Sequence, residues 1–323
     1  MLSRAPDTNG RPFISVVIVV YDMNREAPRT LHTLSAAYQR GIEADEYEVL
    51  VVDNGSPEPL GEAVVRGCGP NFRYHYIDQA SPSPVAAINT GVAMTRGEVV
   101  AVMIDGARMV TPGLLDYGRR AFGLYADPVV TCPAWHLGPK PQQLSVSEGY
   151  DKQREDALLA GIDWRRNGYR LFEVGAPAGS SRDGCFMAMT ESNAVFLRRA
   201  GFDDMGGYDP AFDLPGGGMV NLDFYRRACD RPGTDLVVLF GEGSFHQLHG
   251  GISTNVPRDE TQRRVATWKA QYETIRGEPY RPPKARPVFL GHLHPAAIPF
   301  IRFSAERREA ALTRAQTGGH SLT

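Results

Sequence analysis

The stretch VVAVMIDGARMVTP, residues 99–112, decides the fold. It is apolar as far as Ile104. One carboxylate, Asp105, follows, and after it come a glycine and a polar loop. A continuous apolar run rich in β-branched residues is typical of a strand that is covered on both faces. We therefore expect a buried strand that ends beside Asp105. The segments before it are expected to form a scaffold, and many of the later segments are expected to form the other half of a cleft.

Two apolar runs upstream repeat this pattern. Residues 14–21 (ISVVIVVY) form the first expected strand, and residues 48–52 (EVLVV) form the second, which runs into a turn-forming cluster at 53–56 (DNGS). Residues 72–77 alternate like a more exposed strand. Helical patterns separate these strands at residues 29–40, 60–66 and 84–95. Strands that alternate with helices at this pace predict an α/β fold with a mainly parallel sheet and helices on both faces.

Polar residues follow three of these strands directly: Tyr21-Asp22, Asp53-Asn54 and Asp105-Gly106. In open parallel sheets, ligands bind outside the carboxyl ends of the strands. The three pairs therefore predict a shared ligand cleft at one edge of the sheet.

The pattern changes after Thr111. A helix is expected at residues 114–124 and a short strand at 128–134, and residues 136–185 are irregular and punctuated by glycine and proline, as active-site walls and lids often are. Further helices are expected at 221–229 and 261–276. We divide the chain into a polar leader (1–12), a first half that holds the expected cleft edge (13–135), a second half of the same domain (136–255), and a C-terminal helix and extended arm (256–323).

Composition argues against several classes of protein. The formal net charge is −2 with 22% charged residues, which favours neither global disorder nor a nucleic-acid-binding surface. The four cysteines form no C-x-x-C pair, so we expect free thiols in a reducing compartment. Residues 1–12 lack the apolar core of a signal peptide, and no apolar run approaches the roughly 20 residues that span a bilayer. We expect a cytoplasmic protein.

Four segments carry a family likeness: ISVVIVVYD, LVVDNGS, AINTGVAMTRGEVVAVMID and NAVFLRRAGFDDMGGYDPAF. In this order and at this spacing, over roughly residues 13–250, the sequence resembles the inverting family 2 glycosyltransferases. The resemblance implies a GT-A (Rossmann-like) fold, here with an irregular insertion and a C-terminal arm. It also implies a hexosyltransferase-like enzyme of carbohydrate biosynthesis, which moves a sugar from a nucleotide-diphosphate sugar to an acceptor hydroxyl with inversion.

The resemblance implies that residues 13–135 are the nucleotide-sugar-binding half and residues 136–255 the acceptor-binding half of the same GT-A domain. It assigns the donor site to the first of these. Val20 and Tyr21 would line the base pocket, and Asp53 with Asn54 would face the base or ribose, the alternative being a solvated turn. Asn89 would cap or orient the sugar-nucleotide loop, the alternative being helix packing. Asp105 would be the first acid of the family's DXD-type motif.

The motif departs from the family pattern, because it reads Asp105-Gly106-Ala107. Ala107 stands where relatives carry a carboxylate that holds a divalent cation. A diphosphate leaving group needs charge neutralisation, which Mn²⁺ or Mg²⁺ normally supplies through oxygen ligands. The resemblance thus implies a weakened cation site, for which Arg108 offers an alternative positive charge.

The acceptor half departs as well. In relatives an aspartate at the start of the helix that here begins near Val220 is the general base, but this chain has Asn221, which cannot take a proton at neutral pH. Asp223 matches the next acidic position of the pattern, which is usually structural, and Asp213 precedes the glycine run. We therefore keep both carboxylates as candidates for the base.

Two histidines could complete a cation site. His246 resembles the histidine that ligates the ion in metal-dependent relatives, and His249 is a competing candidate three residues later. A structural role for a lone histidine near a strand end is the alternative interpretation for either residue.

A second function remains open. With Ala107 and Asn221 in place of two acids, the chain could be a non-catalytic descendant that binds a nucleotide sugar or a partner enzyme. A dinucleotide-dependent oxidoreductase is disfavoured, because residues 21–24 (YDMN) do not form a G-x-G-x-x-G turn. The acceptor stays undefined among saccharides, lipid-linked sugars and small molecules, and the C-terminal arm could pair two subunits or lie against a membrane-bound partner.

Overall fold

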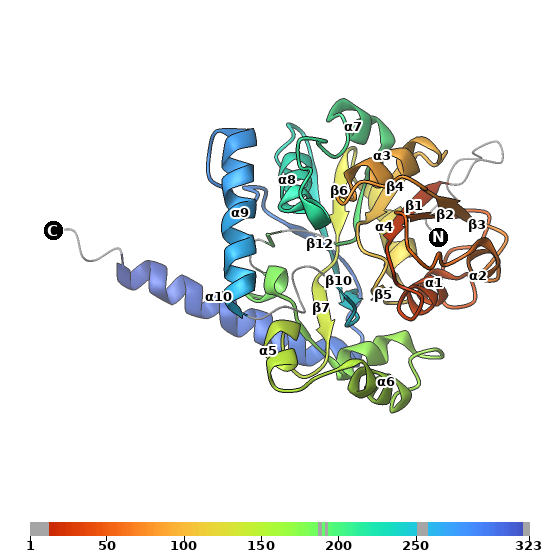
Figure 1. Cartoon of the computed structure of the whole chain (residues 1–323). Helices are drawn as coiled ribbons and strands as arrows, with labels where there is room; N and C mark the ends of the chain where they lie inside the picture. The colour runs from red at the N-terminus through yellow and green to blue at the C-terminus, as the bar shows by residue number, and fades with distance from the viewer. Residues whose placement is uncertain (1–12, 187–188, 191–192, 251–257, 319–323) are drawn as a thin grey trace.

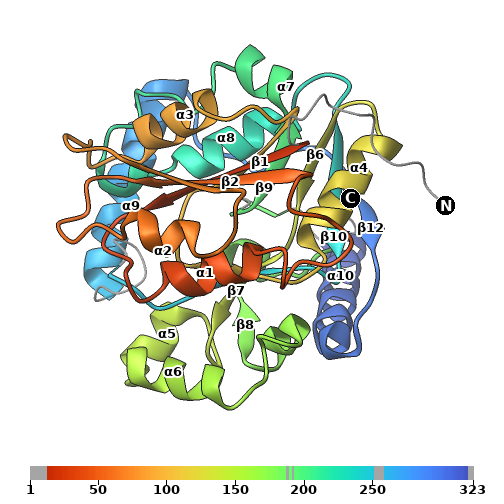
Figure 2. The same ribbon diagram turned by 90° about the vertical axis from the view of Figure 1, so that its right-hand side faces the viewer.

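A computed structural model describes residues 13–186, 189–190, 193–250 and 258–318 of the 323-residue chain. The expected leader at 1–12 and the expected boundary at 255–256 lie outside the described residues. Figures 1 and 2 show a large central sheet covered by helices, with a smaller sheet and a lobe of short helices beneath it.

The large sheet has eight strands in the order β12-β10-β6-β9-β4-β1-β2-β3. Its strands are β1 (Ile14–Val20), β2 (Tyr47–Asp53), β3 (Phe72–Tyr76), β4 (Val99–Met103), β6 (Pro128–Thr131), β9 (Val195–Arg198), β10 (Asp235–Phe240) and β12 (Val288–Gly291). Among these strands, β9 runs antiparallel to its neighbours, β4 and β6. The predicted α/β class with a mainly parallel sheet is therefore confirmed, and β1, β2 and β4 lie side by side as expected.

The pleat of β1 explains why its sequence is apolar almost without a break. Ile14, Val16, Ile18 and Val20 face one hydrophobic core, whereas Val17 and Val19 face another. The first core is closed by helices α1 (Ala27–Leu34), α2 (Glu62–Arg66) and α4 (Leu114–Leu124). The second is closed by α3 (Val85–Ala93), α8 (Val220–Cys229) and α9 (Arg258–Arg276), so that helices lie on both faces of the sheet (Figure 2).

A second sheet was not foreseen from the sequence. It has four strands in the order β5-β11-β7-β8, formed by β5 (Arg108–Val110), β11 (Ser244–His246), β7 (Ala134–Leu137) and β8 (Gly175–Pro177). The expected strand at 128–134 is in fact divided, with β6 in the large sheet and β7 in the small one. Strands this short carry too few residues for a period to be recognised.

The insertion packs against this second sheet. It contributes α5 (Gln142–Ser147), α6 (Lys152–Ala160) and two 3₁₀ turns, η1 (Gly168–Glu173) and η2 (Gly179–Ser181). Trp135, Phe172 and Phe245 form the aromatic centre of a third hydrophobic cluster there. The residues that the sequence left irregular thus share a core with the small sheet.

The C-terminal segment is only partly the arm that the sequence suggested. After α9, strand β12 joins the large sheet beside β10, and η4 (Pro295–Ala297) leads into helix α10 (Ile298–Gly318). Phe300 and the Ser304 hydroxyl, which accepts from the backbone NH of Cys185 at 3.1 Å, fasten the start of α10 to the insertion. The rest of α10 projects away from the body (Figure 1).

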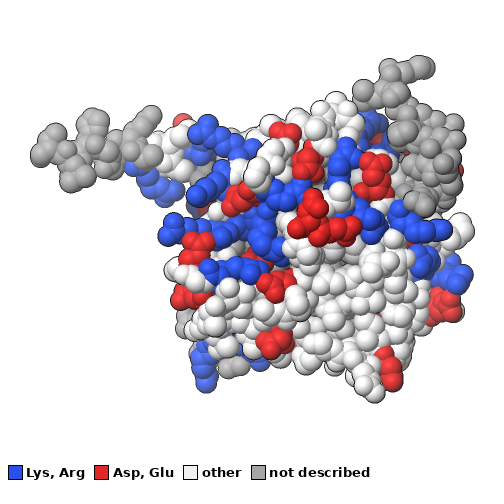
Figure 3. Space-filling view, turned by 90° about the horizontal axis from the view of Figure 1, so that it is seen from above, with Lys and Arg blue, Asp and Glu red and all other residues white. Residues whose placement is uncertain are grey.

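The remaining elements are α7 (Arg199–Asp204) and η3 (Pro215–Gly217). On the face that Figure 3 shows, basic and acidic side chains are interspersed. The ion pairs Arg276–Asp223 and Arg226–Glu278 fasten α8 to α9 and the residues that follow it. Among the described residues, no helix has both the length and the apolar character that crossing a bilayer requires.

Candidate active site

Asp105 lies just beyond the carboxyl end of β4, pressed against the end of β1. The Gly106 NH donates to the Val19 carbonyl at 2.8 Å, and a Cβ at Gly106 would come within 2.4 Å of Val20 Cγ1. Only glycine permits this close approach to β1. The Ala107 NH donates to Asp105 Oδ1 at 2.9 Å, which leaves Oδ2 to face the rest of the site.

The pairing of β5 with β11 brings two histidines to Asp105. These strands are antiparallel, with His246 opposite Arg108, and the Gln247 NH donates to the Ala107 carbonyl at 2.8 Å. In an antiparallel pair, one chain advances as the other recedes. Three residues past His246 therefore meet three residues before Arg108, which places His249 beside Asp105.

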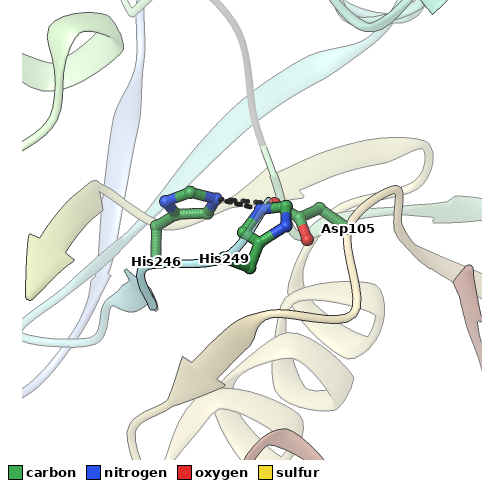
Figure 4. A group of neighbouring side chains, drawn as sticks. All are labelled: Asp105, His246 and His249. Atoms are coloured by element: carbon green, nitrogen blue, oxygen red, sulfur yellow. Dashed lines mark hydrogen bonds and ion pairs between the residues drawn. The ribbon is translucent and has the colours of Figure 1, made fainter. Parts of the chain in front are cut away.

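The three side chains point toward one another (Figure 4). His246 Nε2 is 2.8 Å from Asp105 Oδ2, His249 Nε2 is 3.6 Å from the same oxygen, and the two Nε2 atoms are 3.0 Å apart. One ligand atom from each residue lies within 4.8 Å of the others. The structure thus brings together the three residues that the sequence offered as metal ligands.

Burial and mutual charge set the protonation of this cluster. Burial, followed by the charge of Arg108, lowers the pKa of His246 to about 4. Burial also acts to lower the pKa of His249, but the Asp105 carboxylate outweighs it and raises that pKa. Burial opposes ionisation of Asp105, yet the neighbouring histidines hold its pKa well below the usual range. Of the two histidines, His249 is therefore the one whose protonated form the Asp105 carboxylate favours.

This donor set fits a divalent cation. One carboxylate oxygen and two imidazole nitrogens converge, and each of these atoms can offer a lone pair to an ion. Carboxylate ligands suit both Mg²⁺ and Mn²⁺, whereas imidazole is a ligand of transition metals and not one that Mg²⁺ prefers. Asp105, His246 and His249 could hold such an ion.

The last residue of the motif and its neighbour have different surroundings. Ala107 is fully buried in the first hydrophobic core, so its side chain belongs to the packing beneath the site. The Arg108 Nε lies 3.7 Å from Asp105 Oδ2, and its side chain is only 10% exposed. Arg108 therefore adds a positive charge next to Asp105, as the sequence suggested.

The carboxyl ends of β1 and β2 lie next to the end of β4, which carries Asp105. Val20 is buried, whereas Tyr21 is 54% exposed. Asp22 adopts a positive φ of 52°, and its NH donates to Ser56 Oγ at 2.9 Å. The Asn54 NH donates to the Val20 carbonyl at 2.9 Å, so the two loops are joined. The exposed ring of Tyr21 is the one in this group that can stack on a ligand.

The carboxylate of Asp53 is used inside the protein. It is fully buried, with Oδ1 accepting from the Ser56 NH and Oδ2 accepting from the Leu60 NH and the Tyr74 hydroxyl. Asn54 is 7% exposed, and its side-chain amide donates to the Ser81 carbonyl at 2.9 Å. Both side chains hold the turn in its shape.

Asn89 connects the donor half to the acceptor half. Its Nδ2 donates to the Tyr208 carbonyl at 2.8 Å, and its Oδ1 accepts from the Tyr208 NH at 3.0 Å. Helix α3 is thereby fixed to the loop that precedes α8. This arrangement is the packing role that was the alternative for Asn89.

The candidate bases have unequal environments. Asp223 is 1% exposed, and both of its oxygens are bonded to arginines: Oδ2 to Arg227, and both oxygens to Arg276. Asp213 is exposed and accepts from Gln271 Nε2 at 2.9 Å. Asn221 is 6% exposed, and its Nδ2 lies 3.4 Å from Asn193 Oδ1. Of the two carboxylates, Asp213 is the one that is open to solvent.

Residues of the insertion that the sequence did not single out support the histidines. Gln142 from α5 contacts both the ring and the carbonyl of His246. Glu155 from α6 accepts from the Leu248 NH at 2.7 Å, and Arg25 bonds to both Glu155 and the Leu248 carbonyl. No sequence signal links these positions, because their contacts span about a hundred residues or more.

Part of the chain is similar in sequence to known proteins. Residues 15–105 match the model of the family described as glycosyl transferase family 2. Glycosyltransferase AglE of Haloferax volcanii is 33% identical over 105 residues, a stretch that makes up 31% of this chain and 32% of that protein. The match thus spans about a third of the length of this curated relative.

Solved structures extend the likeness of the fold. TarS 1-349 of S. aureus in complex with UDP superposes with a TM-score of 0.50 and 12% identity, over 81% of this chain and 72% of that chain. The same protein in complex with UDP-GlcNAc gives 0.50 and 11%, over 81% and 73%. The architecture is that of the GT-A glycosyltransferases, and the matched family segment ends at Asp105.

Proposed function

We propose that this protein is a family 2 glycosyltransferase that transfers a sugar from a nucleotide-diphosphate donor to an acceptor hydroxyl with inversion. The observation that carries the proposal is the Asp105–His246–His249 cluster at the carboxyl edge of a GT-A sheet, where the matched family segment ends. The relatives add support, since a TarS structure holds UDP-GlcNAc and the Haloferax protein is a glycosyltransferase.

The donor would lie across the ends of β1, β2 and β4. The exposed ring of Tyr21 is suited to stack on the base, and Asp53 and Asn54 keep the neighbouring turn in place. A bound divalent cation, Mn²⁺ more readily than Mg²⁺, would neutralise charge on the diphosphate. Arg108 supplies a fixed positive charge at the same place. These features favour departure of a nucleoside diphosphate.

In the reaction, the acceptor oxygen forms a bond to the anomeric carbon while the bond from that carbon to the diphosphate oxygen breaks. The electron pair leaves with the nucleoside diphosphate, and the hydroxyl proton passes to a carboxylate. We assign that role to Asp213, because Asp223 is buried between two arginines and Asn221 has no basic oxygen. Asp223 then fastens α8 to α9.

A direct test compares Asp105→Asn with Asp45→Asn. Asp45 is an exposed carboxylate before the amino end of β2, at the opposite edge of the sheet. We expect the Asp105 change to reduce nucleotide-sugar turnover by about 10²-fold or more, and the Asp45 change to leave it unaltered. Full turnover by Asp105→Asn would refute the site.

The donor can be found by thermal shift with a panel of nucleoside diphosphates, with Mn²⁺ or with a chelator, since a ligand of the native state raises its stability. A shift that needs Mn²⁺ supports the cation. A shift without turnover of any sugar donor would favour the non-catalytic alternative, in which the cleft serves binding alone.

A further inference from the structure

Trp268 on α9 lies beside a run of three glycines, Gly216, Gly217 and Gly218. All three have a positive φ, of 72°, 79° and 56°, which residues with side chains rarely adopt. A Cβ built at Gly218 would come within 3.3 Å of Trp268 Cδ1 and 3.2 Å of Gln271 Oε1. The indole is only half-buried against the second hydrophobic core, and in the described part of the chain its Nε1 has no hydrogen-bond partner. Because the glycines have no side chains, part of this aromatic ring stays exposed.

Two polar side chains lie next to the ring. Gln271 follows Trp268 by three positions on α9, which places both on one face of the helix. Gln271 Nε2 donates to Asp213 Oδ1 at 2.9 Å. Asp213 is exposed, and no described residue donates to its Oδ2. Trp268, Gln271, Asp213 and the glycine run, here called the Trp268 patch, therefore combine part of an aromatic ring with one free donor and one free acceptor.

The Trp268 patch adjoins the donor edge of the sheet through a single loop. Asn54, at the carboxyl end of β2, donates from Nδ2 to the Ser81 carbonyl at 2.9 Å. The next residue of that loop, Pro82, accepts at its carbonyl from the Gly216 NH at 3.0 Å. This loop thus contacts the end of β2 through one residue and the glycine run through the next. The patch therefore lies next to the place where the donor is expected.

The chemistry of the Trp268 patch suits a saccharide. A pyranose ring has a face of C–H groups that packs on an aromatic ring, and its hydroxyls both donate and accept. One hydroxyl can donate to Asp213 Oδ2 while another accepts from Trp268 Nε1. A purely apolar acceptor would leave both of these groups unpaired, which costs free energy. Aromatic surface with a few placed polar groups is typical of sites for small molecules.

We propose that the Trp268 patch is the acceptor site and that it takes a sugar ring, which stacks on Trp268 with its attacking hydroxyl at Asp213. The part in transfer rests on the proposed function, whereas binding of a sugar to the patch needs no catalysis. Asp213 both orients the hydroxyl and receives its proton. Trp268 holds the ring away from the bond that breaks, so it sets the affinity for the acceptor and not for the donor.

The experiment uses the full chain with ¹⁵N-labelled tryptophan. The other two tryptophans, Trp135 and Trp164, are only 4% and 2% exposed, so a ligand at the surface can be read from one indole signal. The probes are the methyl pyranosides of glucose, galactose, mannose and N-acetylglucosamine, with and without Mn²⁺ and UDP or GDP, and cyclohexanol as an apolar alcohol. Trp268→Phe assigns the signal, Trp268→Ala removes the ring, and Lys269→Ala is the control at the adjacent exposed position. Saturation-transfer NMR gives the affinity of each variant.

We expect at least one glycoside to shift the Trp268 indole signal and leave the other two unchanged. Its affinity should fall about tenfold or more in Trp268→Ala and stay within about twofold of the wild type in Lys269→Ala. Cyclohexanol should not shift the signal. The proposal is overturned if no glycoside shifts the signal, if cyclohexanol binds there as well as the glycosides do, or if Trp268→Ala binds like the wild type.

The remaining outcomes also decide. If Trp268→Ala does not fold, Asp213→Ala at an exposed position carries the test, and unchanged glycoside affinity in that variant contradicts the site. If a glycoside binds at the patch but no sugar donor transfers to it, the saccharide site stands and the proposed transfer fails. If transfer occurs and Trp268→Ala has the acceptor KM of the wild type, the transferase stands and the Trp268 patch is not its acceptor site.

Discussion

His246 lies directly opposite Arg108 in the antiparallel pair of β5 and β11. This register makes His249 the neighbour of Asp105 and places both histidines at one carboxylate. A shift of the register by one residue would turn the alternate side chains of β11 to the other face of the sheet. The site therefore depends on a pairing between segments more than a hundred residues apart.

Replacing His249 should weaken cation binding and leave the fold intact. His249→Ala removes one of three converging ligands, so we expect Mn²⁺ affinity to drop by more than the roughly 10- to 100-fold typical of an outer-shell partner. His292→Ala, at an exposed histidine outside the cluster, is the control and should bind like the wild type. Calorimetry with Mn²⁺ measures both. Unchanged affinity of His249→Ala would remove His249 from the site.

Substitutions of Asp213 and of Asp223 should have different effects: the first on turnover, the second on stability. Asp213→Asn is expected to lower turnover by about 10²- to 10⁴-fold, the usual contribution of a general base, with a small change in unfolding free energy. Asp223→Asn should instead destabilise the protein by about 3 kcal/mol, because Arg227 and Arg276 lose a buried charge partner. Urea unfolding and steady-state kinetics are run on both. The reverse pattern would return the role of base to Asp223.

Replacing Glu155 should lower the unfolding free energy far more than replacing a surface glutamate of the same insertion. Its side chain is fully buried, bonded to Arg25 and to the Leu248 NH between the two histidines. Glu155→Gln should lower the unfolding free energy by about 2 kcal/mol and weaken Mn²⁺ binding as the 246–249 segment loosens. Glu148→Gln breaks an exposed pair with Lys140 and should cost less than about 0.5 kcal/mol. Equal effects of the two changes would contradict this interpretation.

Glu242 should make stability depend on pH. Burial raises its pKa from 4.5 to about 7, although hydrogen bonds from Thr111, Tyr169 and the Gly113 NH act to lower it. A raised folded pKa contributes stability that is complete below pH 4.5 and is lost as the pH rises through about 7.

The variant Glu242→Gln stays neutral throughout this range, so it isolates the effect. Its unfolding free energy should rise relative to that of the wild type by roughly 3 kcal/mol between about pH 4.5 and pH 8. Urea titrations at closely spaced pH values measure the difference. A pH-independent difference for Glu242→Gln would mean that the carboxyl is ionised across the range.

The sequence by itself determined the central strands of the sheet and predicted a ligand-binding edge. Continuous apolar runs in β1, β2 and β4 can exist only where both faces are covered, and parallel strands bring their carboxyl ends together. Asp105 could therefore be predicted as a site residue, with His246 and His249 offered as its partners. These inferences need only local patterns and a family likeness.

The tertiary structure alone decided how those residues meet and what holds them. The small sheet is built from strands of three and four residues, too short to show a period, yet its register sets the distance from His249 to Asp105. Gln142 and Glu155 act through contacts with residues about a hundred positions away. Asp53 looked like a ligand-facing residue and proved to be buried in its own turn, because burial and hydrogen-bond partners depend on the packed chain and not on the local sequence.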